Sequence, residues 1–185
     1  MKRSVFILVG LFAIVVINAQ TESMKFSGIP MNQKYSSFIQ ALKQKGFNDN
    51  VKQGEWRFAP GYNFITLAGK FWHFDNCEIR VMYSAETDSI ASVGVRKMFF
   101  STWHNKVFEL MSNLDLKYGE RIKLKESAKE SKYRWFSKES LGMVEVNWFM
   151  NSLTDQFWVI YYTSDYTKKV LQKELNAKLS ELEDL

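Results

Sequence analysis

The chain has little of the material from which common active sites and disulfide scaffolds are built. Its 185 residues include one cysteine, two histidines and two prolines. Because Cys77 is alone, no intramolecular disulfide can form and stability must come from packing. The thiol stands between Asn76 and Glu78 at the start of an expected strand. We interpret it as a small buried hydrophobe and not as a nucleophile.

Motifs for metal, phosphate and nucleophilic chemistry are also missing. HExxH, CxxC, calcium-loop and GxSxG patterns do not occur, and the glycines are isolated from one another, so none forms a phosphate-binding loop. The sequence therefore predicts no cofactor, no metal site and no catalytic residue. A hydrolase that uses His73 or His104 as its base is the third candidate function, since a triad needs only one histidine.

Charge of neither sign is concentrated. The chain holds 25 basic and 20 acidic residues, for a formal net charge of +5. The densest basic groups alternate with apolar or acidic neighbours. Nucleic-acid binding requires a clustered basic footprint, so we expect no nucleic-acid partner.

The first 19 residues have the pattern of a signal peptide. Two basic residues follow the initial Met, residues 5–17 are almost all apolar, and Ala19 precedes a polar residue. The apolar run is shorter than the roughly 20 residues that a membrane-spanning helix needs. We therefore expect cleavage after Ala19, export to the periplasm or cell exterior, and a mature chain, residues 20–185, that forms a single compact unit without a transmembrane segment.

Helical and strand periodicities alternate along the mature chain. Apolar residues at helical spacing mark residues 35–42, 103–114 and 165–185. Alternation with a period of two marks strands at residues 62–74, 77–84, 90–100, 121–127, 133–138, 143–150 and 156–163, while residues 48–60 stay undecided. The sequence predicts an α+β fold of two helix-plus-antiparallel-sheet modules (α-βββ, α-βββ) with a C-terminal helix. Two repeats are expected at about residues 26–100 and 101–165.

A set of short motifs carries a resemblance. The segment FSGIPM, residues 26–31, is interpreted as punctuation before the first helix, because Gly28 and Pro30 oppose helix formation. With LKQKGF, LAGKF, CEIRV and KYG further along, it resembles a group of small exported Bacteroidetes proteins without an assigned function. The expected architecture is also similar to the tandem modules of β-lactamase inhibitor proteins and of small outer-membrane assembly factors. Such a likeness implies a fold but no function, and this chain lacks the inhibitors' disulfides.

Aromatic residues are the one class in excess, at 16% of the chain with six Trp and fifteen Phe. Adjacent aromatic residues in a strand point to opposite faces of the sheet. If helices cover one face, the other must display aromatics. The sequence thus predicts a non-enzymatic protein that binds a protein or envelope partner through an aromatic-rich sheet face. The predicted contacts are Trp72, His73, Phe74, Trp148 and Trp158.

Two alternatives remain open at this point. A carbohydrate-binding module would use the same aromatics as platforms for sugar rings, and a fold that covers both sheet faces would leave no such surface. The leucines of the C-terminal helix also permit two interpretations. We expect Leu171, Leu175, Leu179 and Leu182 to pack on the chain's own sheet, with a dimer seam as the alternative.

Overall fold

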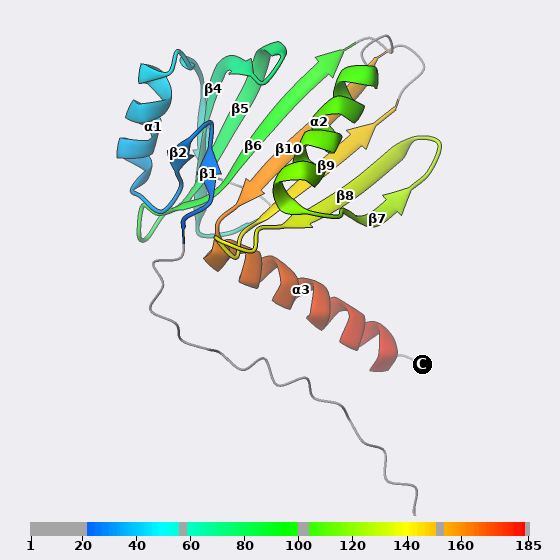
Figure 1. Ribbon diagram of the computed structural model, residues 1–185. Helices are drawn as coiled ribbons and strands as arrows, with labels where there is room; N and C mark the ends of the chain where they lie inside the picture. The colour runs from blue at the N-terminus through cyan, green and yellow to red at the C-terminus, as the bar shows by residue number, and fades with distance from the viewer. Residues whose placement is uncertain (1–21, 56–58, 100–103, 151–153, 184–185) are drawn as a thin grey trace, which may run out of the picture.

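One eight-stranded antiparallel sheet forms the centre of the fold. The computed structural model describes residues 22–55, 59–99, 104–150 and 154–183 (Figure 1). Across the sheet the strands follow the order β3-β4-β5-β6-β10-β9-β8-β7. Their bounds are Asn48–Glu55 (β3), Tyr62–Phe71 (β4), Phe74–Ser84 (β5), Ile90–Phe99 (β6), Ile122–Glu126 (β7), Glu130–Phe136 (β8), Met143–Phe149 (β9) and Asp155–Tyr162 (β10). The α+β class and the antiparallel sheet are confirmed.

Two helices cover one face of this sheet. They are α1 (Tyr35–Gln44) and α2 (His104–Tyr118) (Figure 1). Phe38 in α1 and Leu110 and Met111 in α2 are buried in a single core together with the inward-pointing strand residues. Both helices follow the periodicity expected from the sequence, because each buries a stripe of apolar residues at helical spacing.

Pairing between strands decides which side chains share a face. A row of aliphatic residues, all fully buried, crosses five neighbouring strands at Leu67, Ile79, Val95, Val159 and Val146. We call this side the helix face and the opposite side the open face. Successive residues in each strand alternate between them, because the side-chain repeat of a strand is two.

The FSGIPM segment forms a hairpin of its own, where the sequence predicts only a break before the first helix. β1 (Lys25–Phe26) pairs with β2 (Ile29–Pro30), and the two residues between them have φ angles of 49° and 78°, the second being Gly28. Positive φ at both central positions is the type I′ geometry of tight hairpins. Phe26 is fully buried and stacks on Phe71 at a centroid distance of 5.8 Å. The hairpin therefore anchors the beginning of the described chain to the core.

Strand bounds differ from expectation by up to three residues, as in β8, which begins at Glu130 and not at residue 133. The strand expected over residues 62–74 ends at Phe71, because Trp72 has a φ of 53° and forms a turn with His73 that leads into β5. The undecided stretch after α1 contains β3, so each half of the sheet has four strands and not the three of the predicted α-βββ modules. Residues 56–58 lie outside the described part of the chain.

The third helix, α3 (Ser164–Glu183), begins where β10 ends and extends beyond the edge of the sheet (Figure 1). Its first turn packs through Tyr166, whose ring stacks on Tyr162 at 5.9 Å. Further along, Leu175 and Leu179 are 51% and 50% exposed. The expectation that these two leucines pack on the sheet is wrong, because about half of each side chain is exposed.

Both ends of the chain lie outside the described residues. The expected signal peptide, residues 1–19, is among them, so its cleavage stays a prediction. In the part that the structure describes, none of the helices combines the length and the apolar character needed to cross a bilayer.

The close packing at Gly69 predicts that a side chain at this position lowers stability. A Cβ atom on Gly69 would lie 2.3 Å from Cδ1 of the buried Phe47 ring. Because that ring cannot retreat without moving other core side chains, Gly69→Ala should lower the free energy of unfolding by about 1–3 kcal/mol in urea denaturation. Gly94→Ala is the matched control, since its Cβ would meet Trp158 at an ordinary 3.6 Å. If both variants were equally stable, the packing argument would be wrong.

Candidate functional site

The five predicted contact residues do not share one surface. Phe74 and Trp148 are buried in the core, at 0% and 4% exposure. Trp72 is partly buried against the same core at the turn between β4 and β5, and His73 beside it is exposed. Of the five, only Trp158 lies on the open face, where it pairs in register with an open-face residue of β6. The surface expected from these five residues is therefore not assembled.

Strand register explains which aromatic of each adjacent pair faces outward. In β9, Trp148 points to the helix face, where its ring meets Phe108 of α2 at 5.3 Å, and Phe149 points to the open face. In β10, Phe157 is buried and Trp158 lies on the open face. The expected alternation is confirmed, but the sequence alone did not show that Trp148 takes the inner position.

Trp158 lies in the middle of a band of mixed polar and apolar side chains. Its neighbours in register are Arg96 on β6 and Asn147 on β9. The adjacent row brings Phe149 and the 54% exposed Met98 to either side of a glutamine on β10. The term Trp158 face is used here for Glu78, Arg80, Arg96, Met98, Asn147, Phe149, Gln156 and Trp158.

Two arginines hold the indole ring. The guanidinium carbons of Arg80 and Arg96 lie over the Trp158 ring at 5.1 and 5.7 Å from its centroid, within the range of cation–π attraction. Arg80 Nη2 donates to Glu78 Oε1 at 2.7 Å. Arg96 donates through Nε and Nη2 to Gln156 Oε1 at 3.1 and 2.8 Å. These bonds orient both guanidinium groups before any partner arrives.

A small pocket lies between Trp158 and the first turn of α3. It has a volume of about 120 Å³ and is lined by Arg80, Met82, Ser92, Gly94, Trp158, Ile160, Tyr162 and Tyr166. We call it the Trp158 pocket. Its walls come from both halves of the sheet and from α3, so sequence reasoning on single segments had no signal for it.

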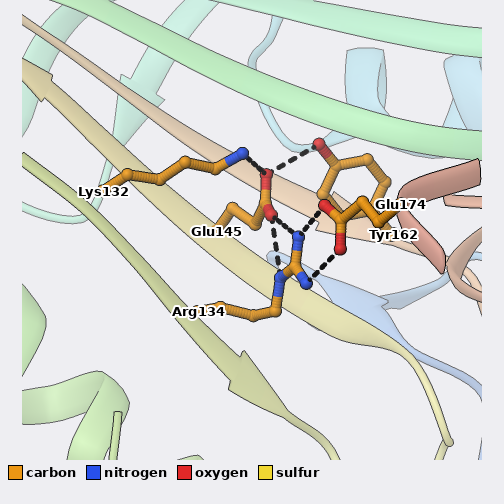
Figure 2. A network of polar contacts seen from close by, with 5 residues as sticks. All are labelled: Lys132, Arg134, Glu145, Tyr162 and Glu174. Atoms are coloured by element: carbon orange, nitrogen blue, oxygen red, sulfur yellow. Dashed lines mark hydrogen bonds and ion pairs between the residues drawn. The ribbon is translucent and has the colours of Figure 1, made fainter. Parts of the chain in front are cut away.

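A buried ion network attaches α3 to the open face (Figure 2). Arg134 on β8 donates from Nε to Glu145 Oε1 at 2.9 Å and from Nη1 and Nη2 to the Glu174 carboxylate at 2.8 and 2.6 Å. Glu145, only 2% exposed, also pairs with Lys132 and accepts a hydrogen bond from the Tyr162 hydroxyl. The network brings together β8, β9, β10 and α3.

The network changes the proton affinities of its members. The hydrogen bond from Arg134 lowers the pKa of Glu174, since it stabilises the carboxylate form. Hydrogen bonding to Glu174 likewise raises the pKa of Arg134. Burial, with a further contribution from Glu145, raises the pKa of Tyr162 well above its ordinary value. The arginine and the carboxylate of α3 therefore stay charged at neutral pH.

One acid–base pair lies elsewhere, at the start of α2. His104 Nε2 bonds to Oδ2 of the buried Asp155, the first residue of β10. The imidazole also contacts the rings of Phe99 and Trp148 at 6.5 and 4.9 Å. The sequence identifies His104 as a candidate base but gives no signal for its carboxylate partner, which lies 51 residues further along the chain.

The single thiol of the chain is buried in the core. Cys77 is 1% exposed, and burial raises the pKa of its thiol to about 11, so the nucleophilic thiolate is scarce at neutral pH. The expectation of a small buried hydrophobe at Cys77 is confirmed. Among the described residues, no group of three or more His, Cys, Asp and Glu side chains is arranged to hold a metal ion.

A larger, open groove of about 1070 Å³ lies where the β5–β6 turn approaches the start of α3. Its lining includes Glu22, Lys34, Glu86, Asp165 and Lys169, so charges of both signs are mixed along it. Because Glu22 is the first described residue, the groove adjoins a part of the chain that the structure does not describe. The Trp158 face, which lies wholly on described strands, is the better-defined site.

The ion network predicts a strong effect of a single isosteric change. Glu145→Gln removes one of the two carboxylates that pair with the buried Arg134, and only Glu174 then balances its charge. The free energy of unfolding should therefore fall by about 3 kcal/mol. The exposed Glu139 provides the matched control, Glu139→Gln, which should unfold at nearly the wild-type urea concentration. Equal midpoints for the two variants would mean that the network adds nothing to stability.

The lowered pKa of Glu174 predicts that the contribution of the Arg134–Glu174 pair to stability is lost in acid. The unfolded chain binds the Glu174 proton more readily than the folded one, so the contribution to stability is fully present above the ordinary pKa of about 4.5 and is lost as pH falls through the lowered folded value. Urea unfolding at about pH 6 and about pH 3.5 should therefore show a smaller acid loss in Glu174→Gln than in the wild type. An identical loss in both would contradict the assignment.

Comparison with known proteins found no matching family model, no similar curated protein and no similar solved structure. The resemblance to small exported Bacteroidetes proteins, and to tandem modules like those of β-lactamase inhibitor proteins, stays a prediction from the sequence motifs. The function therefore has to be argued from the geometry of the open face.

Proposed function

We propose that the protein is an exported, non-enzymatic binding protein that contacts a protein partner of the cell envelope through the Trp158 face. The observation that carries the proposal is a half-buried tryptophan at the centre of a sheet face, with two guanidinium groups over its ring. Tryptophan and arginine are enriched among the residues that dominate binding energy at protein interfaces. Phe149 and Met98 add apolar area beside them, and Asn147 and Gln156 add polar groups.

A carbohydrate-binding module is the second candidate, because the amides of Asn147 and Gln156 lie in the rows around the indole. A sugar ring stacks on an indole only where a ring face is free. Here the guanidinium groups of Arg80 and Arg96 lie over the Trp158 ring, and a sugar would have to displace them from their cation–π contacts. This geometry favours a protein partner over a glycan.

A hydrolase is the third candidate, and the pairing of His104 with Asp155 is the observation in its favour, since a carboxylate orients the imidazole in catalytic triads. Catalysis also needs a nucleophile or a bound substrate beside the imidazole. The ring contacts of the imidazole in the described part of the chain, with Phe99 and Trp148, supply no nucleophile. We propose instead that the pair attaches the start of α2 to the start of β10.

We also propose that the chain consists of two modules, at about residues 26–100 and 101–165. Each half has one helix followed by four strands, α1 with β3 to β6 and α2 with β7 to β10. The order across the sheet supports this division, because the first strand of each half is outermost and the last strands, β6 and β10, meet at the centre. The Trp158 face spans the junction of the two halves.

Site-specific photo-crosslinking tests the proposed surface. A benzophenone amino acid is placed at Met98 on the open face or at Phe108 on α2, residues that are 54% and 51% exposed. In the cells that make the protein, ultraviolet light should produce a discrete protein adduct from position 98 and little from position 108. Trp158→Ala should weaken the adduct at position 98 by about tenfold or more, as expected for the central residue of an interface.

Two results would contradict the proposal. One is an equal adduct from both positions, since that would indicate contact without a preferred face. The other is an adduct at position 98 that is unchanged by Trp158→Ala. A glycan array serves as the comparison for the second candidate, because a protein-specific face should give no saccharide signal.

A further inference from the structure

We propose that the Trp158 pocket binds the C-terminal residue of a partner chain, with an apolar side chain in the pocket and the terminal carboxylate beside Arg80 and Arg96. This inference rests on the proposed function, since it names the part of a protein partner that the Trp158 face would recognise. The size, the lining and the charge of the pocket carry it.

The size of the pocket suits one side chain. Its volume is about 120 Å³, and cavities of about 150 Å³ with apolar walls bind a molecule as large as benzene. The space exists because Gly94, opposite Ile160 in the β6–β10 ladder, has no side chain to fill it. Met82 and the rings of Trp158 and Tyr166 complete the largely apolar lining of this half-open pocket. A leucine side chain, or a phenylalanine ring that extends partly through the open mouth of the pocket, is therefore the fitting occupant.

The far wall of the pocket is held in place before binding. Tyr166 belongs to the first turn of α3, and its ring contacts Tyr62 edge-on at 5.1 Å and stacks on Tyr162 at 5.9 Å. The ion network of Glu174 attaches the same helix two turns further along. A pocket with fixed walls binds more tightly, because little side-chain entropy is lost on association.

The charge beside the pocket suits an anion. Among the side chains of the Trp158 face, Arg80 and Arg96 contribute two positive charges and Glu78 one negative charge, which leaves one positive charge on that face. Glu78 lies 2.7 Å from Arg80 and 3.7 Å from Arg96, whose nearer partner is the neutral amide of Gln156 at 2.8 Å. The planar guanidinium group is the side chain best shaped to hold a carboxylate with two parallel hydrogen bonds.

The Trp158 pocket lies directly beside the positive charge of the arginines, which favours a chain terminus over an internal acidic residue. Arg80 lines the pocket and also lies over the indole ring. The last residue of a chain carries its side chain and its carboxylate on the same Cα atom. An internal aspartate or glutamate carries its carboxylate on another residue, with a Cα about 3.8 Å further along. A C-terminal residue can therefore place its side chain in the pocket and its carboxylate beside the arginines over a shorter distance than an internal acidic residue can.

Small probes test the pocket directly. The indole N–H signal of Trp158 is followed by NMR, with its assignment taken from its absence in Trp158→Phe. N-acetyl-L-phenylalanine should shift this signal saturably, and N-acetyl-L-phenylalaninamide, which lacks the carboxylate, should bind about five- to tenfold more weakly. A third probe, N-acetyl-phenylalanyl-aspartyl-amide, carries an internal acid and should bind no better than the amide.

Variants of the protein separate the contribution of the apolar pocket to probe binding from the contribution of the arginine charge. Ile160→Trp fills the pocket and should abolish the shift of the Trp158 indole signal by N-acetyl-L-phenylalanine and by its amide. Arg96→Gln should weaken the free acid to the level of the amide and leave the amide unchanged. The exposed Lys129 provides the control Lys129→Gln, which removes the same charge from a residue that does not line the pocket and should keep the wild-type preference. Circular dichroism of each variant confirms that it is folded.

Several outcomes would overturn the inference: no saturable shift with the wild type, equal affinity for acid and amide, or binding of the internal acid as tight as that of the free acid. The crosslink from position 98 separates these results from the proposed function. Its loss in Ile160→Trp supports the pocket as the docking point. Its persistence there overturns the pocket while the Trp158 face remains the binding surface, and an absent crosslink in the wild type contradicts the proposed function itself.

Discussion

The antiparallel pairing of β6 with β10 is the contact on which the rest of the structure depends. It joins the two halves into one sheet. On the helix face it sets Val95 beside Val159 in the core, and on the open face it sets Arg96 beside Trp158. A slip of one residue would exchange the two faces of a strand. The same register therefore decides both the continuity of the core and the composition of the candidate site.

The attachment of α3 is the second constraint, and it makes the two halves of the open face different. Arg134 and Glu145 are buried beneath the helix, and Glu174 of the helix supplies the second carboxylate (Figure 2). A buried charge without its partner is strongly unfavourable, which holds the helix at one place on β8 to β10. In that place α3 supplies Tyr166 as a wall of the Trp158 pocket, while the distal part of the helix extends past the sheet (Figure 1).

Much of the secondary structure could be predicted, and the site only in part. In the described part of the chain, helical and two-residue periodicity predicts the segments of all three helices and of seven of the eight strands of the main sheet, because both signals are local. The turn at Trp72 and His73 was missed, since a tryptophan with positive φ has no sequence signature. Phe74 and Trp148 were assigned to the surface although they are buried, because alternation shows that neighbours face opposite ways but not which way is inward.

By itself the sequence determined the fold class, the absence of a disulfide and the supply of aromatic residues on alternating strand positions, because composition and short-range periodicity are properties of neighbouring residues. Tertiary structure decided which sheet face α1 and α2 cover, that β6 and β10 meet, and that Arg134, Glu145 and Glu174 come together from three elements. These features depend on strand register and on contacts between residues far apart in the chain, where local periodicity carries no information.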